Sequence, residues 1–169
     1  KTSWPTLSDD LKSDKFDIAM GGITATSERA KDFILSDPVT YTGKIPLIRK
    51  ADRKKYLSLK EIDKPNVTVV ENLGGTNLQF AKNNIFHAKL VVVPENKMAF
   101  EYLLQKKADV MFTDNIEAVY RQKIMPALYA VNPDQPYTHT AKVYLMNKNN
   151  VKLSKKINKC LDLIKKKRI

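Results

Sequence analysis

The sequence has few of the residues from which metal centres and thiol sites are built. Its 169 residues include one cysteine, Cys160, and two histidines, His87 and His139. A lone cysteine cannot form an internal disulfide, and the two histidines lack the spacing of a zinc site. We interpret Cys160 as a core residue on the apolar face of the last predicted helix. The composition therefore predicts neither a metal site nor a nucleophilic thiol.

Long apolar runs are missing as well. The longest ones, such as residues 90–93, have the length of a strand, whereas a membrane span needs about 18 apolar residues. The first five residues do not form the apolar core of a signal peptide, but a mature or cut chain would lack one too. The sequence predicts no membrane insertion, and the absent signal does not argue for the cytoplasm.

Acidic residues are outnumbered, with 18 Asp and Glu against 30 Lys and Arg and a formal net charge of +12. The lysines are spread along the chain, with a denser run at residues 165–168 and no basic helix interleaved with aromatic residues. Because that distribution does not fit a nucleic-acid-binding pattern, we expect no nucleic-acid partner. We interpret the surplus as a solvated surface whose positive field also speeds capture of an anionic substrate.

Strand-like and helix-like segments alternate along the chain. Short apolar runs bounded by turn residues predict strands, and apolar residues at a 3.6-residue period predict helices. This order predicts an α/β fold with mostly parallel sheets and flanking helices. The strands are expected at residues 16–20, 44–49, 67–70, 90–93, 110–113 and 128–131, and the helices at residues 7–13, 77–83, 96–106, 115–123 and 153–166.

Two polar stretches, residues 50–55 and 132–136, are the expected crossings between two lobes. Residues 1–49 and 136–169 would form lobe 1 together, and residues 50–135 would form lobe 2. Lobe 1 opens on a helix and offers two or three strand candidates, whereas an α/β lobe normally opens with a strand and its crossover helix. We therefore expect lobe 1 to be incomplete, with its N-terminal part missing from this chain.

Residues 21–29 are the first candidate binding segment. They follow a predicted strand and contain two glycines, which let a ligand approach the backbone closely. Thr24, Thr26 and Arg29 add hydroxyls and a guanidinium, which can donate two parallel hydrogen bonds to a carboxylate. The alternative is a helix N-cap at Thr26 or Ser27 with Arg29 on the surface.

Residues 72–77, Asn-Leu-Gly-Gly-Thr-Asn, are the second candidate segment. They follow the strand at 67–70 and open a helix, so free backbone N–H groups there favour an anion. Ligands of α/β sheets bind at such carboxyl ends of strands. The segment is neither a Walker loop nor a dinucleotide fingerprint. A tight turn with an Asn cap is the alternative.

Asp114 and Glu117 form the third candidate, after a buried strand that ends in Thr-Asp. A carboxyl at the mouth of a cleft has its pKa raised by burial and can then donate a proton. The alternative is structural, because Asp114 at the N-cap with Glu117 three residues later has the spacing of a capping box. Spacing alone does not decide between the two.

Residues 17–29 resemble the D-I-A-x-x-G-I-x-x-T-x-x-R segment of the family 3 periplasmic amino-acid-binding proteins. The resemblance covers nearly the whole chain. It implies a two-lobed, type II periplasmic-binding-protein fold and a periplasmic location. It also implies that Thr26 and Arg29 bind a ligand carboxylate and that Asp114 meets an α-amino group.

Further details resemble one branch of that family, the cyclohexadienyl dehydratases. Residues 72–77 are similar to the N-P-G-G-T-N segment of that branch, with Leu73 in place of proline. Residues 113–117 resemble its T-D-x-x-E segment, and residues 130–145 resemble its A-V-H-P-x-x-P-F and K-A-Y-L tail, with Asn132 where histidine is usual.

The dehydratase resemblance implies conversion of prephenate to phenylpyruvate, or of arogenate to phenylalanine, with loss of water and carbon dioxide. It implies Glu117 as the general acid, a small anionic substrate, a possible homo-oligomer, and no metal or organic cofactor. Arg29 and Lys44 would be the cations for the substrate carboxylates. The implied substrate-binding residues are Trp4, Thr24, Thr26, Arg29, Lys44, Asn72, Gly75, Thr76, Asn77 and Asp114.

Two alternatives remain open at this point. A non-catalytic amino-acid-binding protein of an ABC transporter would use Arg29 for the α-carboxylate and Asp114 for the α-amine. Such a protein has no need of an acid at Glu117, so Glu117 and Asn72 discriminate between the two functions. A degenerate, truncated paralogue without a ligand is the second alternative.

Overall fold

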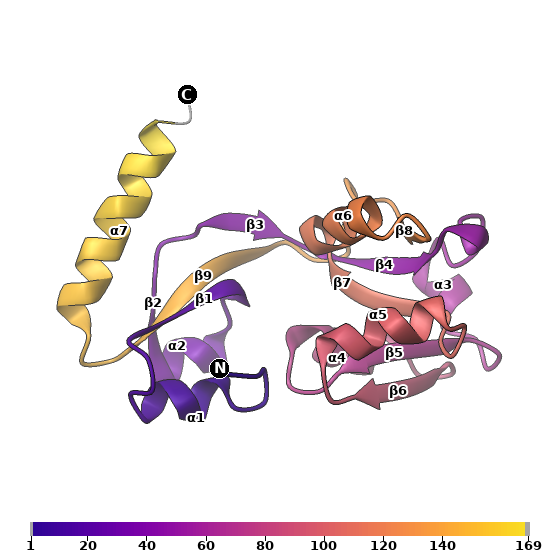
Figure 1. Ribbon diagram of the computed structural model, residues 1–169, viewed down its shortest axis with the longest axis horizontal. Coiled ribbons are helices and arrows are strands. Elements are labelled where there is room, and N and C mark those ends of the chain that lie inside the picture. The colour runs from indigo at the N-terminus through magenta and orange to yellow at the C-terminus, as the bar shows by residue number, and fades with distance from the viewer. Residues whose placement is uncertain (1, 168–169) are drawn as a thin grey trace. The chain divides into compact units, whose positions relative to one another are not determined.

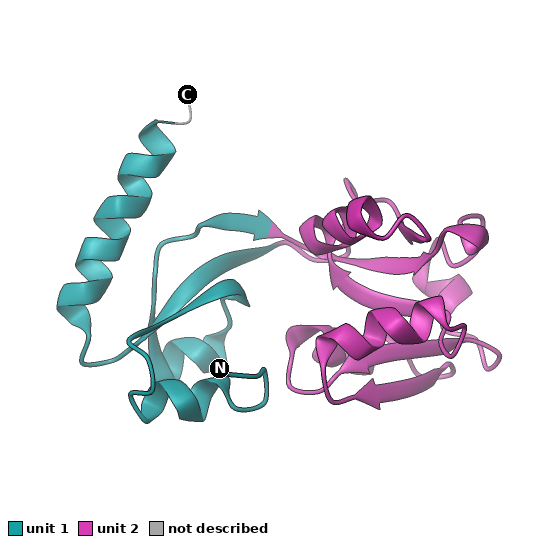
Figure 2. Ribbon diagram, in the orientation of Figure 1, with its two compact units in different colours: residues 1–41, 140–169 teal, residues 42–139 magenta. Residues whose placement is uncertain are grey.

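The computed structural model describes residues 2–167, and the chain divides into two compact units. Unit 1 comprises Lys1–Tyr41 and Thr140–Ile169, and unit 2 comprises Thr42–His139 (Figure 2). Both units combine helices with a β-sheet, which confirms the α/β class expected from the sequence. Within residues 2–167, no helix has the length and apolar character needed to cross a membrane.

Unit 2 is built on a five-stranded sheet with the strand order β6-β5-β7-β4-β8 (Figure 1). β5 pairs in parallel with β6 and β7, whereas β4 runs antiparallel to β7 and β8. The strands are β4 (Lys44–Arg49), β5 (Thr68–Asn72), β6 (Lys89–Val93), β7 (Val110–Asp114) and β8 (Leu128–Ala130), and the helices are α3 (Leu59–Ile62), α4 (Thr76–Asn84), α5 (Asn96–Leu104) and α6 (Asn115–Ile124), with a 3-10 turn, η1, at Lys50–Asp52.

Both faces of this sheet are apolar and buried. On one face Met111 packs with Phe100 and Leu103 of α5, and on the other Val69 and Phe112 pack with residues of α4. Successive side chains of a strand point to opposite faces. Glu71 therefore shares a face with Val69, and Asp114 shares a face with Phe112. Burial on two sides explains why these strands read as continuous apolar runs.

Unit 1 contains a smaller, antiparallel sheet around β9. β1 and β2 pair with opposite edges of β9, and β3 also pairs with it. The register of β1 shifts between Ala19 and Ile23, where Gly21 and Gly22 have positive φ angles that other residues rarely adopt. The strands are β1 (Ile18–Thr24), β2 (Phe33–Leu35), β3 (Thr40–Thr42) and β9 (Thr140–Asn147), and the helices are α1 (Leu7–Lys12), α2 (Ser27–Asp32) and α7 (Val151–Lys166).

The structure corrects the expected lobe boundaries and strand directions. The sequence placed residues 44–49 in lobe 1, but β4 pairs with β7 and β8 and belongs to unit 2. Tyr137 N–H donates to the Lys44 carbonyl at 2.9 Å, which fixes residues 136–139 to unit 2 as well. The mostly parallel pairing holds only for β6-β5-β7, because an apolar run does not encode the direction of its strand.

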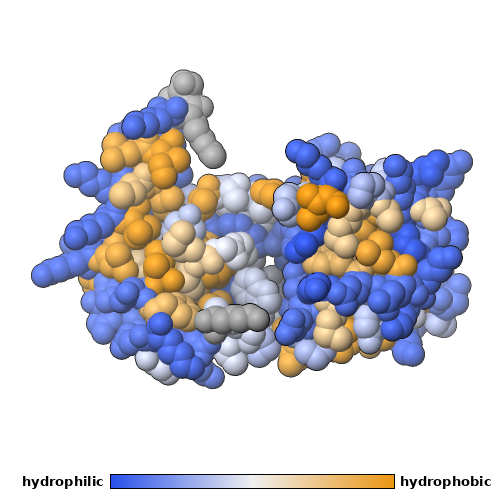
Figure 3. All heavy atoms as spheres, viewed as in Figure 1, coloured by the Kyte–Doolittle hydropathy of each residue, from blue (hydrophilic) through white to orange (hydrophobic). Residues whose placement is uncertain are grey.

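Cys160 is a second correction, since its side chain is exposed on α7. The helix has the expected apolar stripe, but among the described residues of α7 only Leu161 of that stripe is buried, together with the polar Ser154. Leu163 and Ile164 are about half-exposed, and Figure 3 shows apolar surface along this helix. The core interpretation failed because helical periodicity predicts an apolar face without showing how much of that face the fold covers.

Asp63, at the end of α3, holds the loop before β6 through hydrogen bonds to residues 86–88. Its Oδ1 accepts hydrogen bonds from the backbone N–H groups of Phe86, His87 and Ala88 at 2.9, 2.6 and 2.9 Å. Its Oδ2 lies 2.8 Å from Nδ1 of His87. Burial acts to raise the pKa of Asp63, but the hydrogen bonds from Ala88, His87 and Phe86 outweigh it and hold that pKa well below its ordinary value.

We expect Asp63→Asn to lower the free energy of unfolding at pH 7 by about 2 kcal/mol, because hydrogen bonds to a charged group are the stronger ones. The folded pKa lies below the unfolded value of about 3.9, so this stabilisation is present above the unfolded pKa and is lost as the pH falls through the folded pKa. Urea unfolding at pH 7 and at low pH measures it. An equal difference between variant and wild type at both pH values would contradict the assignment.

Candidate functional site

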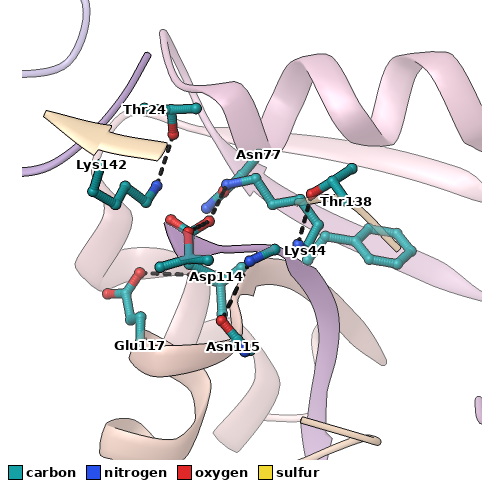
Figure 4. A network of polar contacts seen from close by, with 12 residues as sticks. Thr24, Lys44, Asn77, Asp114, Asn115, Glu117, Thr138 and Lys142 are labelled. Atoms are coloured by element: carbon teal, nitrogen blue, oxygen red, sulfur yellow. Dashed lines mark hydrogen bonds and ion pairs between the residues drawn. The ribbon is translucent and has the colours of Figure 1, made fainter. Parts of the chain in front are cut away.

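Lys44 is the centre of a polar cluster in unit 2 (Figure 4). Its register partner across the antiparallel β4–β7 pair is Asp114, so the first residue of one strand faces the last residue of the other. Nζ of Lys44 lies 3.0 Å from Oδ1 of Asp114 and also donates to Oδ1 of Asn77 in the first turn of α4. Lys44 is only 4% exposed. A buried ammonium is thus held between a carboxylate and an amide oxygen.

Asp114 occupies the N-cap position of α6, as the spacing predicted, but its side chain makes no capping hydrogen bond to that helix. Its Oδ1 instead accepts a hydrogen bond from Oγ1 of Thr42 at 3.1 Å, beside the ammonium of Lys44. The capping alternative therefore holds for the position of Asp114 but not for its side chain. Its carboxylate is part of the Lys44 cluster at the carboxyl end of β7.

Glu117 occupies the first turn of α6 and is 30% exposed at its side chain. Its Oε2 accepts from Oγ1 of Thr113 at 2.7 Å (Figure 4). Its Oε1 accepts from Nδ2 of Asn96 at 3.2 Å and from the guanidinium of Arg121 at 3.3 Å. The carboxyl is therefore held in one orientation by side chains from β7, α5 and α6.

The loop from β5 to α4 brings the predicted residues 72–77 to the same end of the sheet. Asn72 is buried, and its Nδ2 donates to the carbonyl of Leu73 at 3.1 Å. The N-cap of α4 is Gly75, so the Asn-cap alternative does not apply. A Cβ at Gly75 would lie 3.5 Å from Nδ2 of Asn72, in ordinary contact. Thr76 and Asn77 then form the start of the helix.

Glu71 is a buried residue at this edge of the sheet that the sequence patterns did not single out. Its side chain is fully buried, and its Oε1 accepts from the N–H of Phe112 at 2.6 Å. Burial raises the pKa of Glu71 well above its ordinary value, with the N–H of Phe112 and the charge of Lys44 opposing that effect. A glutamate that ends a run of β-branched residues was the available signal, because such a position in a central strand is normally apolar.

Unit 1 gathers a second set of predicted residues. The guanidinium of Arg29 donates to the carbonyl of Thr24 at 2.7 Å and lies over the ring of Trp4 at 5.8 Å. Burial lowers the pKa of Arg29, which is partly buried and not fully at the surface as the structural alternative had it. Oγ1 of Thr26 accepts from the N–H of Arg29 at 3.2 Å, and Thr26 is the N-cap of α2, as its structural alternative proposed.

Lys142 is a further residue for which no sequence pattern predicted a role. It is 5% exposed, and its Nζ donates to Oγ1 of Thr24 at 2.7 Å (Figure 4). Thr24 and Lys142 are register partners of β1 and β9, as Lys44 and Asp114 are of β4 and β7. Each unit therefore places a buried lysine opposite an oxygen-bearing residue at the end of an antiparallel strand pair.

A family profile that matches nearly the whole chain identifies the family to which it belongs. The sequence profile of the bacterial extracellular solute-binding proteins, family 3, matches residues 1–168. The chain belongs to this family. Membership confirms the two-lobed fold that the sequence resemblance implied, and both sets of polar residues are parts of a solute-binding protein of family 3.

Three relatives of this family 3 protein are informative. The cyclohexadienyl dehydratase of Pseudomonas aeruginosa is 41% identical over 145 residues, which are 86% of this chain and 54% of the relative. The chain thus spans about half the length of that curated relative. An ancestral cyclohexadienyl dehydratase is 46% identical, with 98% of this chain and 69% of that chain covered and a TM-score of 0.55.

The third relative is an ancestral amino acid-binding protein, described as a precursor of cyclohexadienyl dehydratase. It is 33% identical, with 98% of this chain and 70% of that chain covered and a TM-score of 0.89. The family 3 fold therefore occurs both in a protein named as an enzyme and in one named as an amino acid-binding protein.

Proposed function

We propose that the chain is a cyclohexadienyl dehydratase that acts in the periplasm on prephenate, arogenate or both. The observation that carries this proposal is the fixed carboxyl of Glu117 at the carboxyl end of β7, next to the strand residue Asp114 that binds Lys44. Identity supports it, since the chain is 46% identical to an ancestral dehydratase and 33% identical to the ancestral amino acid-binding protein. The family is one of extracellular solute-binding proteins, which supports the periplasm.

The proposed reaction asks little covalent chemistry of the protein. The ring C–O bond breaks, and the departing hydroxyl takes a proton to leave as water. The C–C bond to the ring carboxylate also breaks, carbon dioxide leaves, and its bonding electron pair completes the aromatic ring. Aromatisation supplies the driving force, so one positioned proton donor is the main requirement. General acid catalysis of this kind contributes about 10²–10⁴-fold.

Glu117 is the proposed donor. The contact of Oε2 with Thr113, at 2.7 Å, is shorter than the contacts of Oε1 with Asn96 and Arg121, at 3.2 and 3.3 Å. We assign the transferred proton to Oε1, because its contacts are the longer ones and Thr113 keeps the carboxyl oriented through Oε2. Glu117 then takes up a new proton from water before the next turnover.

Lys44 is the proposed cation for a substrate carboxylate. An ammonium has three N–H donors, and in the described part of the chain Asn77 and Asp114 accept two of them. The remaining donor is available for a carboxylate. Trp4, Thr24, Thr26 and Arg29 of unit 1 and Asn72, Gly75, Thr76 and Asn77 of unit 2 are the other proposed substrate-binding residues.

A second candidate is a non-catalytic amino-acid-binding protein of a transporter, favoured by the 33% identity to the ancestral binding protein. In that function Asp114 would accept the ammonium of the ligand. Asp114 is already paired with the ammonium of Lys44 at 3.0 Å, and Arg29 already donates to Thr24 at 2.7 Å. An amino-acid ligand would have to compete with both contacts, which weakens this candidate.

The test incubates the purified protein with prephenate or arogenate and measures phenylpyruvate by absorbance or phenylalanine by chromatography. The dehydratase proposal predicts product from at least one substrate, at a rate proportional to protein concentration. Calorimetric titration with lysine and arginine is the matching arm for the second candidate. Heat of binding with either amino acid, without product from either substrate, would overturn the enzymatic proposal.

A further inference from the structure

Glu71 has an ionisable carboxyl in the buried interior of unit 2, where a backbone N–H donates to it. It lies in β5, between β6 and β7, one residue before Asn72. Its side chain has no exposed surface, and it has no role in the proposed reaction. Glu71 lies near the carboxyl end of a parallel strand, and α/β sheets bind their ligands at that edge.

The carboxyl of Glu71 reaches from β5 to the backbone of β7. The two strands pair in the register Val69↔Val110, and two residues further on the N–H of Phe112 donates to Oε1 of Glu71 at 2.6 Å. Phe112 directly precedes Thr113, which orients Glu117, and Asp114, which binds Lys44. Glu71 therefore holds the strand end on which the site is built.

The geometry favours the uncharged form of Glu71. Its Oε2 is buried and has no hydrogen-bond partner among the described residues, and no cation of that part of the chain lies in ion-pair distance of it. A buried carboxylate with a single donor is costly, whereas a carboxylic acid accepts the same N–H through its carbonyl oxygen. The direction of its pKa shift, set first by burial, agrees with this.

Two ionisable groups bear on the pKa of Glu71, namely Lys44 of β4 and Glu117 of α6. Lys44 favours the ionised form of Glu71, and Glu117 opposes that form when it has given up its own proton. At the end of β7, Asp114 is paired with Lys44. The other charged residues of the elements around β5 lie at the surface (Lys82, Lys89, Lys97 and the half-exposed Glu101) or pair at the opposite end of β7 (Arg49 with Asp109).

We propose that Glu71 is a positioning residue that, as an uncharged carboxylic acid, keeps the Lys44 ammonium directed at Asn77, Asp114 and an incoming carboxylate. With Glu71 uncharged, the charges of Lys44 and Asp114 cancel. Ionised Glu71 would add a negative charge and repel a carboxylate from Lys44. Only the identity of the ligand as a carboxylate rests on the proposed function.

The test follows the carboxyl carbons of ¹³C-labelled glutamate by NMR as a function of pH, without any ligand. One resonance, absent from Glu71→Gln, is expected to report a protonated carboxyl at pH 7 and to titrate only at higher pH. The side-chain resonance of Lys44, identified with Lys44→Met, is expected to shift with the same midpoint in wild type and to lose that shift in Glu71→Gln. A Glu71 carboxyl that titrates near the usual value of about 4.3 would overturn the proposal, and so would a Lys44 resonance that ignores it.

The pH dependence of the free energy of unfolding is a second measurement, because a purely structural role of Glu71 would not change with pH. A raised folded pKa means that the stabilisation by Glu71 is fully present below its unfolded pKa and is lost as the pH rises through the folded pKa. Glu71→Gln, which keeps the acceptor for Phe112 without the charge, is expected to gain stability relative to wild type between pH 5 and pH 9. Glu101→Gln is the matched control on α5 and is expected to show no such trend. A pH-independent difference for Glu71→Gln would count against the proposal.

Calorimetry with prephenate connects this inference to ligand binding. In the Glu117→Gln background, where prephenate is bound but hardly converted, the affinity is expected to weaken at the pH where the Glu71 resonance titrates, and adding Glu71→Gln is expected to keep the affinity there. An equal loss in both proteins would contradict the role of Glu71. Failure of Glu117→Gln to bind prephenate at any pH would instead contradict the proposed function, while the ligand-free NMR titration still decides the state of Glu71.

Discussion

Glu117→Gln is expected to form phenylpyruvate from prephenate about 10²–10⁴-fold more slowly than wild type, with KM changed only a few-fold. Glutamine keeps an oxygen that accepts from Thr113, but it has no proton to give to the leaving hydroxyl. The loss therefore falls on kcat, because the proton is needed only in the transition state. Continuous absorbance of phenylpyruvate over a range of prephenate concentrations gives both constants.

Two controls keep that result interpretable. Glu101→Gln makes the same chemical change on α5 and is expected to leave kcat and KM unaltered. Calorimetry of prephenate binding to Glu117→Gln is expected to show an affinity within a few-fold of wild type, which separates lost chemistry from lost folding. Full activity in Glu117→Gln would remove the general-acid role from this residue.

Lys44→Met is expected to weaken prephenate binding by at least about 30-fold and to lower the free energy of unfolding by about 3 kcal/mol. The substitution leaves the Asp114 carboxylate, whose side chain is 16% exposed, without its ion-pair partner, and it leaves Oδ1 of Asn77 without that donor. Calorimetry measures the affinity, and urea unfolding measures the stability. Lys82→Met, at an exposed position of α4, is the matched control and is expected to change neither.

A double variant separates the ion pair from the shape of the side chains. Lys44→Met with Asp114→Asn removes both charges, so its stability loss is expected to be smaller than the sum of the two single losses by about 1 kcal/mol or more. Prephenate affinity is expected to stay low in the double variant because the ammonium is still absent. Wild-type affinity in Lys44→Met would show that the substrate carboxylate binds elsewhere.

Local patterns predicted most elements of the fold because each pattern is set within a few residues. The strand at residues 44–49 was predicted with its observed bounds, and the helices that begin at Asn96 and Asn115 were predicted from their first residue. The glycines after β5 and the Thr-Asp end of β7 marked the carboxyl ends of strands correctly, because turn chemistry is also local.

Features that depend on distant pairing could not be predicted. The antiparallel direction of β4, and with it the boundary of unit 2, arises from pairing with β7 and β8. The roles of Glu71 and Lys142 depend on contacts across strands, with Phe112 and Thr24. Cys160 was misplaced for a related reason, because the apolar stripe of α7 does not show which of its residues are buried against the rest of unit 1.

The measurement that bears most directly on the proposed dehydratase is the yield of carbon dioxide and phenylpyruvate from prephenate with the purified protein. Acid-assisted loss of water with decarboxylation predicts the two products in equal amounts, formed in proportion to protein and lost in the heat-denatured sample. If prephenate is recovered unchanged from a sample in which calorimetry shows that it is bound, the dehydratase function is contradicted. The protein would then be a non-catalytic binding protein.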